Sequence, residues 1–167
     1  MFRQMRRNSQ RLSAEECVDI LVRATSGVLA LSGDGGYPYA VPLSYVYDDS
    51  KLYFHSAVQG HKIDAVRGCD KASFCVIDRD EVVAREYTSY FRSVIAFGRI
   101  RILDDADEAR KAMEKLAVKY HPRDIPAHRQ AHIASAGSGM CMIELAVEHL
   151  SGKAAKELVA ARPERGI

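Results

Sequence analysis

The residues best suited to chemistry are Ser56, His61 and Lys62, which lie on either side of Gly60. A hydroxyl, an imidazole and an ammonium group can all donate hydrogen bonds to an anion, and charged donors form the stronger ones. The first N–H groups of a helix have no partner inside it and carry the positive end of its dipole. If a helix begins here, these residues predict an anion site, with phosphate as the favoured ligand.

The same residues also fit an ordinary strand–turn–helix connection with solvated basic side chains. The sequence contains no Walker motif and no dinucleotide-binding glycine pattern. The residues alone therefore leave both interpretations open, and they do not select a particular phosphate ligand.

Two flanking elements are predicted to position this site. A strand over residues 51–55 precedes it, and a helix begins near His61 and ends at Gly68, where a glycine often caps a helix. Residues 39–47 alternate as in a strand, with one face that carries Val41, Leu43, Tyr45 and Tyr47. Pro42 cannot donate to a sheet ladder, so this strand is predicted to lie at an edge or to contain a bulge.

The remaining pattern favours a mainly β protein with added helices. Further strands are predicted over residues 27–32, 71–77, 92–103 and 140–150, and helices over 14–24, from Asp105 to Pro122, and over 126–136. Residues 78–91 are predicted to be a loop, Gly98 to mark a bulge or close approach, and Ser151-Gly152-Lys153 to end the last strand, which has a possible bulge of its own. Five or six antiparallel strands favour a small barrel in a single domain over residues 1–167, with mobile ends at about 1–10 and 160–167.

Composition restricts the function classes. The chain has 167 residues, 47% of them hydrophobic, and a net charge of +2, which is too small to argue for a nucleic-acid partner. No apolar run is long enough to span a membrane, and the first residues lack the apolar core of a signal peptide. A cytoplasmic location is expected.

No metal site is predicted. The four cysteines, Cys17, Cys69, Cys75 and Cys141, form no CxxC pair and have no histidine at zinc-ligand spacing. They are interpreted as small buried apolar residues in a reducing compartment. His128 and His132 lie one helical turn apart without a third ligand, which favours a solvated helix face.

Several segments together resemble the pyridoxamine 5′-phosphate oxidase-like, FMN-binding split-barrel proteins, and most closely the 5-nitroimidazole resistance (Nim-type) flavin reductases. The segments are GVLAL, YPYAVPLSYVYDDSKLYFHSAVQGHKIDAVR, FCVID, EYTSYFRSVIAFGRIRIL, MEKLAVKYHP and MIELAVEHLSGK. The resemblance implies a six-stranded antiparallel split barrel. It also implies a homodimer with two FMN molecules in grooves between the subunits.

The resemblance also implies three groups of cofactor-binding residues. The isoalloxazine ring is expected to lie along Val41, Pro42, Leu43 and Ser44. The ribityl phosphate is expected to contact His55, Ser56, Ala57, His61 and Lys62. A later strand is expected to approach the flavin with Ser93 and Val94, and the site is expected to close with Lys153, from one subunit or the other.

The implied activity is that of an FMN-dependent oxidoreductase that takes electrons from NAD(P)H and reduces the nitro group of a nitroimidazole. His61 is the expected proton donor, because an imidazole titrates near neutral pH, and phosphate binding alone is its alternative role. The substrate side could be lined by Tyr39, Tyr45, Tyr87 and Tyr90, for which core or interface packing is the competing interpretation. True pyridoxamine phosphate oxidases carry a tryptophan and an Arg-x-His motif near the C-terminus. This chain has no tryptophan, so vitamin B6 oxidation is not expected.

Two other functions stay open. A non-catalytic flavin-binding or flavin-sensing module would use the same contacts as the enzyme. A haem-binding split-barrel protein could use His55, His61 or His149 as an axial ligand.

Overall fold

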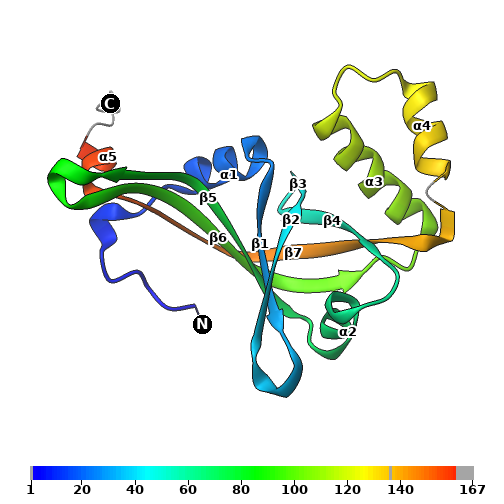
Figure 1. The fold of residues 1–167 in the computed structure, drawn as a ribbon, viewed down its shortest axis with the longest axis horizontal. Helices are drawn as coiled ribbons and strands as arrows, with labels where there is room; N and C mark the ends of the chain where they lie inside the picture. Colours follow the sequence, from blue (N-terminus) through cyan, green and yellow to red (C-terminus); the bar gives the residue numbers. More distant parts are fainter. Residues whose placement is uncertain (1, 136, 161–167) are drawn as a thin grey trace.

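The computed structural model describes residues 2–135 and 137–160, whose strands form one seven-stranded antiparallel sheet (Figure 1). Across the sheet the order is β2-β1-β5-β6-β7-β4-β3. The strands are β1 (Ser26–Ser32), β2 (Pro38–Ser44), β3 (Val46–Asp48), β4 (Lys51–Ala57), β5 (Lys71–Val83), β6 (Thr88–Ile102) and β7 (Met140–Ala154). The predicted mainly β split barrel is confirmed, with one strand more than the six expected.

The sheet closes on itself at Tyr45. The two edge strands, β2 and β3, follow each other in the chain with only Tyr45 between them, and β2 also contacts β4. Tyr45 is fully buried, and its hydroxyl donates a hydrogen bond of 2.8 Å to the Leu21 carbonyl. The single strand predicted over residues 39–47 is therefore wrong, because this corner interrupts the ladder.

The helices are α1 (Ala14–Arg23), α2 (His61–Gly68), α3 (Ala106–Tyr120), α4 (Pro126–Ser135) and α5 (Lys156–Ala160). A capping box stands at the start of α1, where the Glu16 N–H donates to the Ser13 hydroxyl at 3.2 Å. At the start of α3, the Asp105 carboxylate accepts a hydrogen bond from the Glu108 N–H at 2.8 Å. Both helices begin where these residues satisfy otherwise unpaired N–H groups.

The main core fills the barrel under α1. Phe74 lies at its centre, with its ring centroid 4.7 Å from that of Tyr45 and 5.0 Å from that of Phe54. A smaller core lies between α3 and the strands and contains Val46, Tyr53, Leu103, Ala112, Leu116 and Met142. The two cores place α1 and α3 against the closed part of the sheet.

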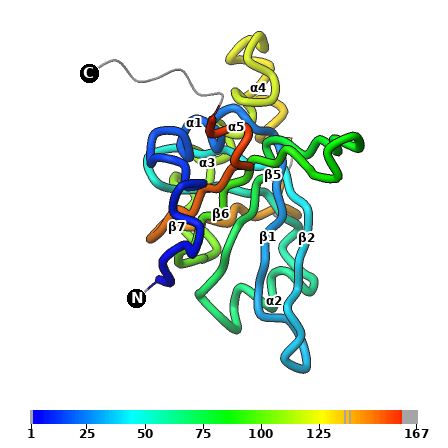
Figure 2. Tube along the Cα trace, turned by 90° about the vertical axis from the view of Figure 1, so that its left-hand side faces the viewer, coloured from blue at the N-terminus to red at the C-terminus, as the bar shows by residue number. Residues whose placement is uncertain are grey.

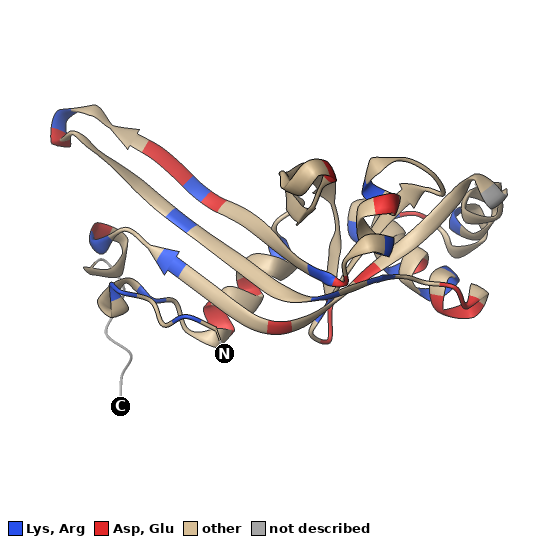
Figure 3. Ribbon diagram, turned by 90° about the horizontal axis from the view of Figure 1, so that it is seen from below, with Lys and Arg blue, Asp and Glu red and all other residues tan. Residues whose placement is uncertain are grey.

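Part of the sheet extends away from the barrel. We call this extension the wing, made of residues 77–94 of the β5–β6 hairpin and residues 149–154 of β7. It projects to the side opposite α3 and α4 in Figure 1, and its strands carry charged residues along much of their length in Figure 3. The loop predicted over residues 78–91 is wrong, since β5 and β6 stay paired as far as Val83 and Thr88. Backbone pairing between strands does not require that one face of the sheet be apolar. Strands in a solvent-exposed ladder can therefore lack the alternation of apolar and polar residues from which strands are predicted.

Two glycines allow close approaches in β6 and β7. The bulge predicted at Gly98 is confirmed, because Phe97 pairs with His149 while Gly98 pairs with Val147. A Cβ at Gly98 would lie 1.9 Å from the Ala146 carbonyl oxygen. The strand end predicted at residues 151–153 is wrong, since β7 continues to Ala154. Gly152 lets it pass α1, where a Cβ would lie 2.3 Å from the Cys17 sulfur.

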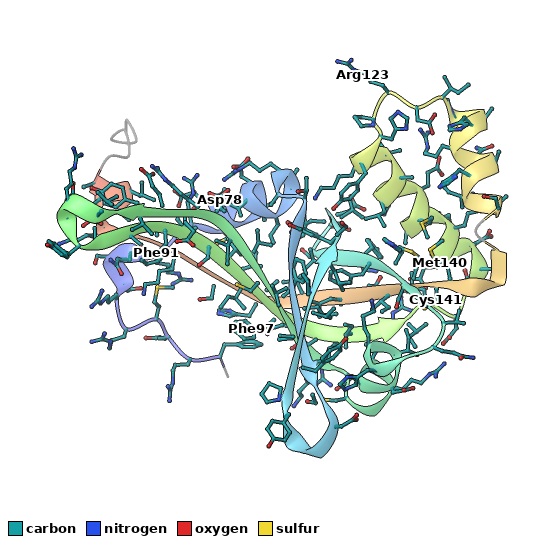
Figure 4. The ribbon with its side chains drawn as sticks, viewed as in Figure 1. Asp78, Phe91, Phe97, Arg123, Met140 and Cys141 are labelled. Atoms are coloured by element: carbon teal, nitrogen blue, oxygen red, sulfur yellow. The ribbon has the colours of Figure 1, made fainter. Side chains whose placement is uncertain are left out.

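Asp78 anchors the wing where it leaves the barrel. The ladder between β5 and β6 shifts register between Ile77 and Arg79. The Asp78 side chain is 2% exposed and forms ion pairs with Arg23 of α1 and Arg92 of β6 (Figure 4). This buried carboxylate therefore ties the wing to the helix that covers the barrel.

Smaller differences concern the ends of elements. β4 runs to Ala57, beyond the predicted end at residue 55. Gly68 is the last helical residue of α2, and Cys69 follows it with an extended backbone, so the predicted glycine cap is wrong. Residues 161–167, which include most of the predicted mobile C-terminal end, lie outside the described residues. Within the described part of the chain, none of the helices combines the length and apolar character needed to cross a membrane.

Candidate functional site

The predicted anion site lies where β4 gives way to α2. Ser56 is buried, whereas its neighbours His55 and Ala57 are exposed, as the alternation of a strand requires. Gly60 precedes α2 with a φ of 116°, a conformation that favours glycine. The strand, the turn and the helix are therefore arranged as the sequence predicts.

The start of α2 presents backbone donors. The N–H groups of Ile63 and Asp64 both donate to the Gly60 carbonyl, at 2.8 and 3.1 Å. The two preceding amides, those of His61 and Lys62, lie ahead of this first helical ladder bond. The positive end of the helix dipole reinforces them, so this end of α2 suits an anion.

Lys62 adds a desolvated cation beside these amides. Its side chain is half-buried, and burial lowers the pKa of its ammonium group below the usual range. The nearby Cys141 thiol opposes this shift, and no carboxylate in residues 2–135 or 137–160 pairs with Lys62. The Cys141 thiol donates at 3.5 Å to the Ala57 carbonyl, which places it at the end of β4 (Figure 4). A half-buried cation without an acidic partner is a physical reason to expect an anionic ligand.

His61 is held against the β1–β2 hairpin. Its ring stacks on Tyr39 with centroids 4.0 Å apart and an angle of 20° between the planes. Its Nε2 atom lies 3.6 Å from a carboxylate oxygen of Asp34 in the turn of that hairpin. Figures 1 and 2 both show α2 beside the hairpin. The imidazole is thus positioned by a ring and a carboxylate, neither of which sequence spacing placed beside it.

The predicted ring-binding strand is β2, at one edge of the sheet. Val41 and Leu43 face the core, while Pro42 and Ser44 are exposed. The edge position predicted from Pro42 is confirmed, and the missing N–H of the proline costs no ladder bond on the open side.

The last group of predicted residues lies elsewhere, at the start of the wing. Ser93 of β6 pairs with Lys153 of β7, and Lys153 Nζ lies 5.3 Å from the centroid of the Phe91 ring. Val94 is fully buried. Ile102, near the His55 end of the sheet, lies eight positions beyond Val94 along β6, which corresponds to about 26 Å of extended strand. One copy of the chain therefore does not bring this group to the β4–α2 site.

The remaining chemistry-bearing residues form no metal site. The described residues contain no group of three or more His, Cys, Asp or Glu side chains that could hold a metal ion. His128 bonds to Asp124 at 2.8 Å through Nδ1. All four cysteines are free; the burial predicted for them is confirmed for Cys17 and wrong for Cys69, Cys75 and Cys141, which are partly exposed.

The sequence prediction missed Asp34 and Cys141 as neighbours of His61 and Lys62. Asp34 reaches the site through the conformation of a hairpin turn, and Cys141 reaches it through the register of β7 on β4. Neither relation leaves a local pattern in the sequence. For Asp34, the run of turn residues from 33 to 36 was the only available signal.

Known structures resemble this one over most of its length. An FAD-binding protein from Mesorhizobium loti has 28% identity and a TM-score of 0.59, with 87% of this chain and 97% of that chain covered. The FAD and haem binding protein from Mycobacterium smegmatis has 22% identity and a TM-score of 0.70, with 93% of this chain and 81% of that chain covered. A candidate 5-nitroimidazole antibiotic resistance protein from Bacteroides thetaiotaomicron has 19% identity and a TM-score of 0.71, covering 86% of each chain.

A comparison with curated proteins finds no match. The family model described as pyridoxamine 5′-phosphate oxidase matches residues 13–154, which include every strand and the β4–α2 site. The chain therefore belongs to the pyridoxamine 5′-phosphate oxidase family.

Proposed function

We propose that this protein binds a flavin, namely FMN, and acts as an oxidoreductase. The observation that carries the proposal is Lys62, a half-buried cation without a carboxylate partner in the described residues, beside the first amides of α2. Family membership supports it, as does the FAD bound by the Mesorhizobium loti protein. The flavin phosphate supplies the negative charge that this site lacks.

The proposed contacts follow the geometry. The phosphate binds at the end of β4 and the start of α2, where the proposed contacts are His55, Ser56, Ala57, His61 and Lys62. The isoalloxazine ring lies along the outer edge of β2, beside Val41, Pro42, Leu43 and Ser44. When bound, the flavin supplies hydride and electron transfer.

His61 has a proposed role in proton delivery. Tyr39 and Asp34 fix its ring at the edge of the site, where an imidazole can pass a proton to a bound substrate. The proposed reaction takes electrons from NAD(P)H and passes them to small acceptors such as nitroimidazoles. A non-catalytic flavin module would bind the cofactor in the same way but would not accelerate this transfer.

A second copy of the chain completes the proposed site. Ser93, Val94 and Lys153 lie about 26 Å along the sheet from the β4–α2 site in one copy. In a homodimer, the wing of one subunit can supply Ser93 and Lys153 to the phosphate site of the other, whereas the Val94 side chain is fully buried in its own subunit and can contribute only its backbone. Each of the two equivalent sites then contains residues from both subunits.

The first experiment is the visible spectrum of the purified protein, followed by mass analysis of whatever heat releases. The expected result is a flavin spectrum and the mass of FMN. The mass of FAD would identify FAD as the cofactor and leave the proposed binding site unchanged. A haem Soret band, as expected for a protein like the Mycobacterium smegmatis one, would replace the proposal with haem binding through His55, His61 or His149.

The phosphate contact is tested by Lys62→Ala. Loss of a charge-assisted contact should weaken flavin binding by about 1.5–3 kcal/mol, measured by fluorescence titration of the apoprotein. Lys71→Ala removes an exposed lysine at the start of β5 and serves as the matched control. Equal affinity in Lys62→Ala and the parent would show that the phosphate binds elsewhere.

The dimeric site is tested by mixing two inactive variants, Lys62→Ala and Lys153→Ala, under conditions of subunit exchange. If each site takes Lys62 from one copy and Lys153 from the other, hybrid dimers recover one intact site. Random pairing in a dimer then restores roughly one site in four. No recovery in proven hybrids would show that Lys153 of a second copy does not complete the Lys62 site.

Turnover measurements distinguish an oxidoreductase from a non-catalytic flavin-binding module. NAD(P)H-dependent reduction of a nitroimidazole, faster than with free flavin, supports the oxidoreductase. A flavin-loaded protein that is inert toward every nitro compound would remove this activity and leave the cofactor proposal intact.

A further inference from the structure

A pocket lies between α1, β3 and α3, and it shares no residue with the β4–α2 site. Its volume is about 520 Å³, within the range of small-molecule sites. Its apolar walls come from Val22, Val46, Tyr47 and Val118, and its charged residues are Asp48, Lys111, Glu114, Lys115 and Lys119. Val22 and Val118 are 53% and 41% exposed, so these apolar side chains are open to solvent.

Lys119 is one of the residues that line this pocket. Its Nζ atom donates a hydrogen bond of 2.6 Å to the carbonyl of Ala24, at the end of α1. The same atom lies 4.2 Å from the centroid of the buried Tyr45 ring. No carboxylate in residues 2–135 or 137–160 forms an ion pair with it, and burial lowers the pKa of its ammonium group to about 8. The protonated form of Lys119 therefore has no nearby acid to stabilise it.

The other charges leave the pocket with an excess of positive charge. Lys115 pairs with Asp48, and Glu114 lies 3.8 Å from Arg129 of α4, so both acidic residues of the lining already have cationic partners. Lys111 forms no ion pair within the described residues. Lys111, Lys115 and Lys119 follow one another at intervals of four and thus share one face of α3. An anionic group on a ligand would complement this face.

We propose that this pocket binds small aldehydes that carry an anionic group and that Lys119 Nζ forms an imine with them. The amine lone pair attacks the carbonyl carbon, the C–N bond forms, and the carbonyl oxygen takes up a proton. The resulting carbinolamine loses its hydroxyl group and the nitrogen proton as one water molecule, and the C=N bond forms. The condensation needs no oxidant or reductant.

The protonation state of Lys119 makes the step feasible near neutral pH. With a pKa of about 8, roughly one tenth of the amine is neutral at pH 7, against about three parts in ten thousand for an ordinary lysine. Only the neutral amine is nucleophilic. A lysine that merely links α3 to the end of α1 would form the same hydrogen bond but would not react selectively.

The test uses 4-carboxybenzaldehyde, with borohydride to trap the imine and peptide mass analysis to locate it. We expect Lys119 to be labelled at least about tenfold faster than the exposed Lys71 at pH 7, with a rate that rises through a midpoint near pH 8. Peptide analysis separates this label from the α-amino group, whose ordinary pKa also lies near 8. Labelling spread over lysines according to their exposure, or a Lys119 midpoint near pH 10, would overturn the proposal.

Variants test whether Lys119 forms the imine and whether Lys111 attracts the anionic group of the aldehyde. Lys119→Arg keeps a positive charge and a hydrogen-bond donor and should abolish the label, whereas Lys115→Arg should retain it. The neutral probe 4-methylbenzaldehyde should react several-fold more slowly than the carboxylate, and Lys111→Gln should reduce this difference. If Lys119→Arg fails to fold, the pH dependence of Lys119 labelling in the parent protein still tests the proposal. The flavin spectrum should be unchanged by labelling, so this outcome is independent of the proposed oxidoreductase.

Discussion

The barrel and the wing are stabilised in different ways. In the barrel, Phe54 and Phe74 are fully buried and the sheet closes on itself under two helices. In the wing, large apolar side chains remain exposed: Ile77 is 64%, Val82 76% and Tyr87 99% exposed. The barrel therefore carries most of the stability of the isolated chain, while the wing offers apolar surface that fits the proposed second copy.

The largest effect is expected in the barrel core. Phe74→Ala should lower the free energy of unfolding by about 3–5 kcal/mol, because it leaves a cavity between the Tyr45 and Phe54 rings. Urea unfolding followed by circular dichroism measures it. Tyr87→Ala, at the tip of the wing, is the matched control and should change stability by less than about 0.5 kcal/mol. Similar losses in both variants would contradict the division between barrel and wing.

An intermediate effect is expected at the junction of the two regions. Asp78→Asn removes the charge that Arg23 and Arg92 share and should cost about 1.5–3 kcal/mol of unfolding free energy. The exposed Asp80, two residues further into the wing, is the control, and Asp80→Asn should have little effect. If hydrogen exchange in the wing is the same in Asp78→Asn as in the parent, the proposed anchor fails.

A smaller, pH-dependent effect is expected at Glu144, a buried carboxylate in the barrel. Burial opposes its charge, but contacts with Lys51 and Arg101, each at 3.0 Å, outweigh this and hold the pKa of the carboxyl below its usual 4.5. Its stabilising contribution is therefore fully present above pH 4.5 and is lost as the pH falls through the lower pKa of the folded state.

Thermal unfolding between pH 7 and pH 3 measures this contribution. Glu144→Gln should flatten the acid side of the stability profile. The control is Glu148→Gln, which affects an exposed ion pair of Arg99 at 3.2 Å and should leave the profile nearly unchanged. Parallel profiles for the Glu144 variant and the parent would exclude Glu144 as a source of acid sensitivity.

Local signals in the sequence predicted much of the fold. Ser13 and Asp105 mark helix starts because a side-chain oxygen close in sequence satisfies the first amides. Pro42 marks the sheet edge because it lacks a donor, and Gly98 marks the bulge because no Cβ fits there. Each of these rules depends on one residue and its immediate surroundings.

Features that depend on distant parts of the chain could not be predicted in this way. The wing has few apolar residues in alternation, so its strands resembled a loop, and only pairing with a neighbouring strand defines them. The β4–α2 site was predictable from spacing, whereas the contacts of Asp34 with His61 and of Cys141 with Ala57 depend on hairpin geometry and strand register. The separation of Lys153 from Lys62 likewise follows from the length of β6 and β7.

The place of β7 in the sheet has a consequence for biosynthesis. This strand lies between β6 and β4 but is the last of the seven strands in the sequence, so the barrel cannot close before the ribosome has synthesised residues 140–154. Until then, β4 and β6 expose unpaired backbone groups that can pair with other nascent chains. Pairs such as Leu52 with Leu145 join residues far apart in sequence and form slowly. Slower translation at reduced temperature should therefore raise the fraction of the protein recovered in soluble form.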